Sequence, residues 1–81
     1  MDLGSVISAN VRAERARRGW RQKDLADRLG WSTDTLSNLE TGQRRVTADD
    51  LPLLCAAFEI DLRRLTLGAD EEDLRKIGLG Q

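Results

Sequence analysis

The sequence has no histidine, no tyrosine and only one cysteine among its 81 residues. Zinc sites in proteins are built largely from Cys and His ligands, and histidine is the most frequent general base. Both kinds of site are therefore excluded, and no arrangement of the acidic residues is typical of an enzyme. The lone Cys55 allows no intramolecular disulfide, and its neighbours Leu54 and Ala56 predict a buried, inert thiol. We expect no catalytic activity, no metal ion and no cofactor.

Long apolar stretches are also missing from the chain. No run approaches the roughly 20 residues that a membrane-spanning helix needs. Residues 1–10 carry no basic residue ahead of their apolar positions, unlike a signal peptide. The sequence therefore predicts a cytoplasmic protein that does not associate with membranes. Its length fits one domain, and a domain of this size buries only about 60 % of its unfolded surface, which leaves little room for a catalytic cleft.

Charge is nearly balanced overall but is divided unevenly along the chain. The formal net charge is −1, yet residues 1–46 carry nine Lys and Arg against six Asp and Glu, whereas residues 47–81 carry four against eight. The first part therefore has a net charge of +3 and the second a net charge of −4. Such asymmetry indicates that one half of the molecule faces a polyanion and the other does not.

The apolar spacing is helical throughout, and glycines mark where helices end. Leu3, Ile7 and Val11 recur every four residues along the first predicted helix. Gly19 and Gly30 follow the first two helices, and glycine suits the left-handed conformation that ends a helix. We predict helices over residues 5–18, 22–29, 32–41, 47–58 and 61–67.

Proline is awkward at position 52, inside the fourth predicted helix, because it removes a hydrogen bond and crowds the preceding turn. We therefore expect that helix to begin irregularly or closer to Asp50. Because no strand-like alternation interrupts the pattern, the predicted fold is all-α. It is a compact bundle of five helices within residues 1–69. Residues 70–81 are predicted to form an acidic tail or a short extra helix.

Residues 22–45 carry the most informative pattern. Two short helices joined by a tight turn cross at a large angle only if little bulk lies between them, and Ala26 is small enough to allow that contact. Gly30 makes the turn. An apolar wedge fills the space between the helices, and it consists of Leu25, Leu29, Trp31, Leu36 and Leu39. This is the anatomy of a helix-turn-helix.

The same stretch resembles the lambda-repressor-like, XRE-type helix-turn-helix domains of phage repressors and bacterial regulators. The matching positions are Gln22, Leu25, Ala26, Leu29, Gly30, the Ser32, Leu36 and Leu39 spacing, and the run Leu-Glu-Thr-Gly that ends at Gly42. With the five-helix layout, the resemblance covers residues 5–67. It implies a lambda-repressor-like DNA-binding domain that regulates transcription as a repressor. Its recognition helix, over about residues 32–41, would enter the major groove.

The resemblance also implies roles for particular residues. Four match the groove-facing positions of the recognition helix and are expected to contact bases: Thr33, Asp34, Ser37 and Asn38. Gln22, Ser32 and Arg44 match phosphate-contacting positions, and Arg45 stands beside the last of these. Arg15 and Glu40 match a partly buried ion pair that ties the first helix to the end of the recognition helix.

The chemistry of these side chains agrees with the implied roles. The four base-contacting candidates share one helical face and are short and polar. Asn can bond bidentately to adenine, the Thr methyl can touch a thymine methyl, and Asp can accept from cytosine N4. The cations that flank the motif supply sequence-independent attraction to phosphates: Arg17, Arg18, Arg21, Lys23, Arg44 and Arg45. The predicted phosphate contacts are therefore Gln22, Lys23, Ser32, Arg44 and Arg45.

Two positions depart from the family pattern. Arg21 stands where the family has a Ser or Thr that caps the helix. Either Asp24 satisfies the free amides there, or the start of that helix is looser. Trp31 is large for a turn, and we expect its ring to pack inward or to lie partly exposed.

The expected partner is a double-stranded DNA operator. One recognition helix covers only a few base pairs, so we expect a symmetric homodimer that forms in solution or only on DNA. The candidates for its interface are Leu62, Leu65, Leu67, Leu74 and Ile77. Some of these five residues must instead belong to the hydrophobic core. The alternative is an antitoxin or other protein-interaction module of the same fold, with residues 70–81 as its partner-binding arm. Steep loss of duplex affinity with rising salt would favour the DNA-binding interpretation.

Overall fold

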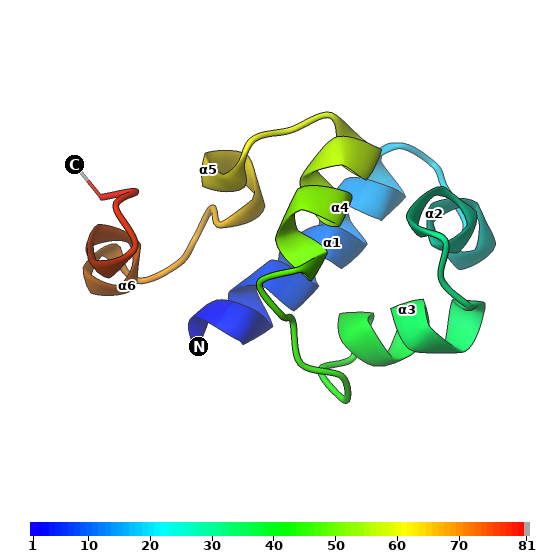
Figure 1. The fold of residues 1–81 in the computed structure, drawn as a ribbon, viewed down its shortest axis with the longest axis horizontal. Coiled ribbons are helices and arrows are strands. Elements are labelled where there is room, and N and C mark those ends of the chain that lie inside the picture. Colours follow the sequence, from blue (N-terminus) through cyan, green and yellow to red (C-terminus); the bar gives the residue numbers. More distant parts are fainter. Residues whose placement is uncertain (81) are drawn as a thin grey trace.

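A computed structural model describes residues 1–80 and shows an all-helical protein in this part of the chain (Figure 1). Its helices are α1 (Leu3–Arg17), α2 (Gln22–Leu29), α3 (Thr33–Glu40), α4 (Asp50–Phe58), α5 (Leu62–Leu65) and α6 (Glu71–Lys76). The predicted all-α class is confirmed, and each of the five predicted helices has a counterpart. The sixth helix lies in the predicted segment 70–81, whose last residue, Gln81, is outside the described residues. Within residues 1–80, no helix is both long enough and apolar enough to cross a membrane.

Local signals set the ends of the first three helices. Asp2 caps α1, because its Oδ1 accepts the Ser5 N–H at 2.8 Å. The helix therefore begins at Leu3, earlier than predicted. Ser32 caps α3 in the same way and accepts the Thr35 N–H at 3.1 Å. Gly30 ends α2 with a left-handed φ of 73°, as the turn of the motif requires.

The two awkward positions are accommodated without breaking a helix. Asp24 Oδ2 accepts the N–H of Arg21 at 2.8 Å, which is the first of the two alternatives for the start of α2. Helix α4 begins at Asp50, as Pro52 led us to expect. Pro52 falls in the first turn, where a backbone N–H has no partner within the helix, so its missing donor costs little.

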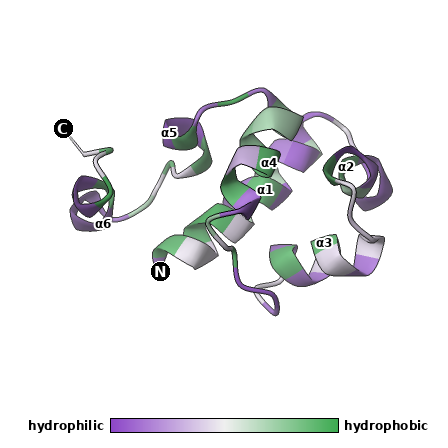
Figure 2. Cartoon of the chain, viewed as in Figure 1, coloured by the Kyte–Doolittle hydropathy of each residue, from purple (hydrophilic) through white to green (hydrophobic). Residues whose placement is uncertain are grey.

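Helices α1 to α5 pack around one apolar core. Helix α2 packs against both α3 and α4, and Ala26 is 1 % exposed there, consistent with a close crossing. The buried core residues are Ile7, Val11, Leu25, Ala26, Leu29, Leu36, Leu39, Leu54, Phe58 and Leu65. Apolar segments of α1 and α4 lie at the centre of Figure 2, whereas α6 is mostly hydrophilic. Trp31 and Cys55 are half-buried against this core, so the predicted buried thiol is corrected to a half-buried one. Burial raises the pKa of the Cys55 thiol.

Helix α6 lies to one side of the other five (Figure 1), and none of its residues is buried. Leu67 in the preceding linker is 64 % exposed, and Ile77 after the helix is 48 % exposed. Leu65, by contrast, is fully buried, and Leu62 packs partly buried against the core. Leu65 is therefore a core residue, and it belongs to the part of the candidate dimer surface that was expected to be core.

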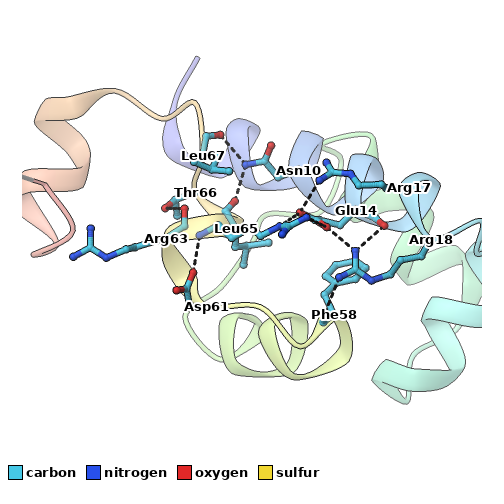
Figure 3. A network of polar contacts seen from close by, with 11 residues as sticks. Asn10, Glu14, Arg17, Arg18, Phe58, Asp61, Arg63, Leu65, Thr66 and Leu67 are labelled. Carbon is cyan, nitrogen blue, oxygen red and sulfur yellow. Dashed lines mark hydrogen bonds and ion pairs between the residues drawn. The ribbon is translucent and has the colours of Figure 1, made fainter.

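A buried carboxylate ties α1 to α4 and α5 (Figure 3). Glu14, whose side chain is 4 % exposed, lies 2.6 Å from Arg18 Nη1, 2.9 Å from Arg64 Nε and 3.6 Å from Arg17 Nη1. Arg18 also donates from Nη2 to the carbonyl oxygen of Phe58 at 2.7 Å. Burial alone would raise the pKa of Glu14, but hydrogen bonds from Arg64 and Arg18 hold it below its usual value. Glu14 is thus an ionised structural residue.

Candidate nucleic-acid interface

The outer face of α3 presents short polar side chains. Leu36 and Leu39 on the inner face are fully buried and fix the rotation of the helix. The four predicted base-contacting residues occupy the other side: Thr33, Asp34 and Asn38 are exposed, and Ser37 is half-buried. Within residues 1–80, none of these four side chains makes a hydrogen bond to another protein group. Their donors and acceptors are therefore available to a ligand that approaches α3.

The C-terminal end of α3 is held by a buried ion pair. Arg15 donates from Nε to Glu40 Oε2 at 2.7 Å and from Nη2 to Oε1 at 3.1 Å. A third donor, Nη1, reaches the carbonyl oxygen of Trp20 at 2.9 Å. The Glu40 side chain is only 2 % exposed. The structure therefore contains the ion pair that the resemblance implied, and it joins α1 to α3.

Gln22 extends this pair to the start of α2. Its Nε2 donates to Glu40 Oε1 at 3.1 Å, so the amide is held beside the C-terminal end of α3 instead of pointing freely outward. An amide nitrogen carries two donors. One donor of Gln22 therefore remains for another acceptor once the bond to Glu40 is made.

The cations around the motif differ in how freely they face solvent. The side chains of Arg21, Lys23 and Arg17 are 82 %, 69 % and 58 % exposed. Lys23 pairs with Asp27 at 3.1 Å, and an exposed pair of this kind is weak. Arg18, expected among the DNA-facing cations, is instead directed inward toward Glu14 and Phe58.

The loop after α3 carries two arginines with different surroundings. Arg44 donates from Nη1 and Nη2 to Asp50 Oδ2 and Oδ1 at 2.7 and 3.2 Å, and its guanidinium carbon lies 4.7 Å from the centre of the Trp31 ring. Arg45 is exposed and forms no ion pair with any residue between 1 and 80. Of these two predicted phosphate contacts, Arg44 is therefore already paired with Asp50, whereas Arg45 is exposed and unpaired among residues 1–80.

Asp50 is the partner of Arg44, and the sequence analysis did not identify this pairing. Its side chain is 6 % exposed, and its Oδ2 also accepts the Thr47 N–H at 2.9 Å. The spacing of Thr47 and Asp50 signals a helix start, and the carboxylate does serve the backbone there. Nothing in that spacing indicates that the same carboxylate also holds Arg44.

Comparison with protein families matches residues 7–67 to the model of a family described as a helix-turn-helix domain. Among curated proteins, the competence pilus inhibition repressor of Acinetobacter baylyi is 36 % identical to this chain over 73 residues. That alignment covers 90 % of this chain and 63 % of the relative, so the chain spans less than two thirds of the relative's length.

Several solved structures share the fold. The hypothetical transcription factor NHTF from Neisseria superposes with a TM-score of 0.75 at 27 % identity, over 93 % of this chain and 85 % of that one. The clp gene regulator ClgR from C. glutamicum gives 0.74 at 28 % identity, over 80 % and 84 %. The restriction-modification controller protein C.AhdI from Aeromonas hydrophila gives 0.68 at 28 % identity, over 74 % and 91 %.

Proposed function

This chain belongs to the helix-turn-helix domain family, and from that premise we propose that it is a repressor that binds a double-stranded DNA operator. The family and the fold are those of DNA-binding transcription regulators and not of enzymes. The observation that carries the proposal is the outer face of α3, where four short polar side chains have no partner in the described part of the protein. Repression is supported by the name of the relative from Acinetobacter baylyi.

Base contacts are assigned to α3 in the major groove. Asn38 and Thr33 are the strongest readers, since Asn pairs with adenine and the Thr methyl packs on thymine. Asp34 favours a cytosine N4 donor and disfavours a nearby phosphate. Ser37 is half-buried and reaches a base only at close approach.

Phosphate contacts are assigned to both sides of α3. Gln22 offers its remaining amide donor, and Lys23 can leave its exposed partner Asp27 for a phosphate. Ser32 stands at the N-terminal end of α3, where backbone amides favour an anion. Arg45 is the free cation of the loop. Contacts of this kind position the protein on DNA, whereas the α3 contacts select the sequence.

A selection from random duplexes tests the proposal and yields the preferred site. Asn38→Ala is expected to weaken binding to that site by about 1–3 kcal/mol and to relax the preference at one base position. Lys76→Ala, on the exposed α6, is the control and should leave binding to the site unchanged. Failure of the wild-type protein to enrich any duplex would contradict DNA binding. Equal losses of Asn38→Ala on selected and random DNA would remove Asn38 from base readout.

We further propose that two copies bind an inverted repeat, with recognition helices about 34 Å apart. The remaining apolar candidates for the contact between copies are the exposed Leu67 and Ile77 and the half-buried Leu74. Sedimentation with and without the selected duplex measures the stoichiometry. Two proteins per duplex are expected, and one protein per asymmetric site at saturation would contradict the dimer.

A further inference from the structure

We propose that Arg44 is a positioning residue for the recognition helix and not a phosphate contact. This inference rests on the proposed DNA-binding function and reassigns one residue of its interface. The two arginines of the loop then have separate tasks, with Arg45 as the cation that meets the DNA backbone.

Arg44 contacts structure on both sides of α3. Its guanidinium lies 4.7 Å from the ring centre of Trp31, which belongs to the turn before the helix. Its backbone N–H donates to the carbonyl oxygen of Asn38 at 3.0 Å, near the end of the helix. Its two Nη atoms bind Asp50 at the start of α4. One residue thus links the turn, the recognition helix and the helix that follows.

The guanidinium group suits this role because it has a planar face and a donor edge. The face packs on the aromatic ring of Trp31, while the edge makes two parallel hydrogen bonds to the Asp50 carboxylate. A lysine ammonium is a compact point charge and cannot make both contacts. The site therefore requires arginine for its shape and not merely for its charge.

The burial of Asp50 holds Arg44 in place. The Asp50 side chain is 6 % exposed, and if Arg44 turned outward Thr47 would be its remaining hydrogen-bond partner, with no cation beside it among residues 1–80. An ionised carboxylate left buried without a cation is costly. Burial alone would raise the pKa of Asp50, but hydrogen bonds from Arg44 and Thr47 keep it below the usual value. Asp50 is therefore charged at neutral pH, and it neutralises the charge that a phosphate would seek.

The test compares variants that change charge with variants that change shape. Arg44→Lys keeps the positive charge but loses the two-point contact, so we expect duplex binding to fall about tenfold, as for one lost hydrogen bond of ordinary strength. Asp50→Asn makes the protein more positive and releases Arg44, yet we expect it to weaken binding by a similar factor. Arg75→Lys, on the exposed α6, is the matched control and should bind as tightly as wild type.

Salt dependence and folding separate the two roles further. Arg45→Ala should reduce the slope of log affinity against log salt by about one unit. Arg44→Gln removes the charge but keeps a donor for Asp50, and it should leave the slope unchanged. Binding is measured at a temperature where circular dichroism shows each variant to be folded. If Asp50→Asn does not fold, Arg44→Lys decides the question alone, because it leaves a cation beside the buried carboxylate.

Tighter binding by Asp50→Asn, or full binding by Arg44→Lys, would overturn the proposal, because both results are expected of a phosphate contact. Thermal unfolding of the two single variants and the double variant tests the link without DNA, and additive losses of stability would overturn it independently. If the wild-type protein binds no duplex, the proposed function fails first. The unfolding data then still show whether Arg44 and Asp50 are coupled.

Discussion

Glu14 and Glu40 are both buried carboxylates that pair with arginines of α1, but they differ in how many partners they have. Glu14 meets three arginines and joins α1 to α4 and α5. Among residues 1–80, Glu40 forms an ion pair with Arg15 alone and receives one further bond from Gln22. The buried carboxylate near α5 therefore has three arginine partners, whereas the one at the C-terminal end of α3 has a single arginine partner. A change at the single cation should reach both stability and DNA binding.

The largest effect is expected from Arg15→Ala. This change leaves the Glu40 carboxylate, 2 % exposed, without a cation, and the loss of one partner of a buried pair costs about 3–5 kcal/mol. That is a large share of the roughly 5–15 kcal/mol that stabilise a small domain. Urea unfolding followed by circular dichroism measures the loss. A loss below about 1 kcal/mol would show that Gln22 alone suffices for Glu40.

Arg64→Ala is the matched control at Glu14. Arg64 is 45 % exposed, and Arg17 and Arg18 remain beside Glu14 after the change. A partly exposed pair with other partners in place contributes little to stability, so we expect only a small loss. A loss as large as that of Arg15→Ala would break the distinction between the two networks.

The smallest effect concerns acid. The folded-state pKa of Glu14 lies below its usual 4.5, so its contribution is fully present above that value and is lost as the pH falls through the folded-state pKa. As the pH is lowered below about 5, we expect the urea concentration at the unfolding midpoint to decrease for the wild-type protein. It should decrease less for Glu14→Gln. Parallel curves for the two proteins would mean that Glu14 does not carry the acid sensitivity.

The sequence was most informative where local chemistry decides the structure. Helix α2 has the predicted bounds. Ser32 caps the start of α3 with its side chain, and Gly30 ends α2 in a left-handed conformation, as predicted. Glu14 also left a signal, because it continues the stripe of Ile7 and Val11 at helical spacing and is buried with them. A charged residue on an apolar stripe predicts a buried partner.

The identity of such partners was beyond the sequence. Arg64 lies 50 positions from Glu14, and only the packing of α5 against α1 brings them together. The contact of Arg44 with Asp50 depends on how the loop after α3 returns to the start of α4. The residues that face DNA in our proposal were thus predictable from the motif. Of the contacts that hold them in place, the resemblance implied the Arg15–Glu40 pair, whereas the contacts of Gln22 with Glu40 and of Arg44 with Asp50 were not predicted.

Helix α6 has a consequence for the cooperativity of the molecule. It has no buried residue. A hydrogen bond from Arg63 Nη1 of α5 to the carbonyl oxygen of Leu79, at 3.1 Å, connects the segment after α6 to the other helices. The free energy of local opening depends on buried contacts, so we expect the amides of α6 to exchange with solvent through small fluctuations. We expect those of Val11 and Leu54, whose residues are 0 % exposed, to exchange only when the core opens. Hydrogen exchange should therefore divide residues 1–80 into two units of protection at the linker that carries Leu67, with α6 able to change its contacts while the rest stays folded.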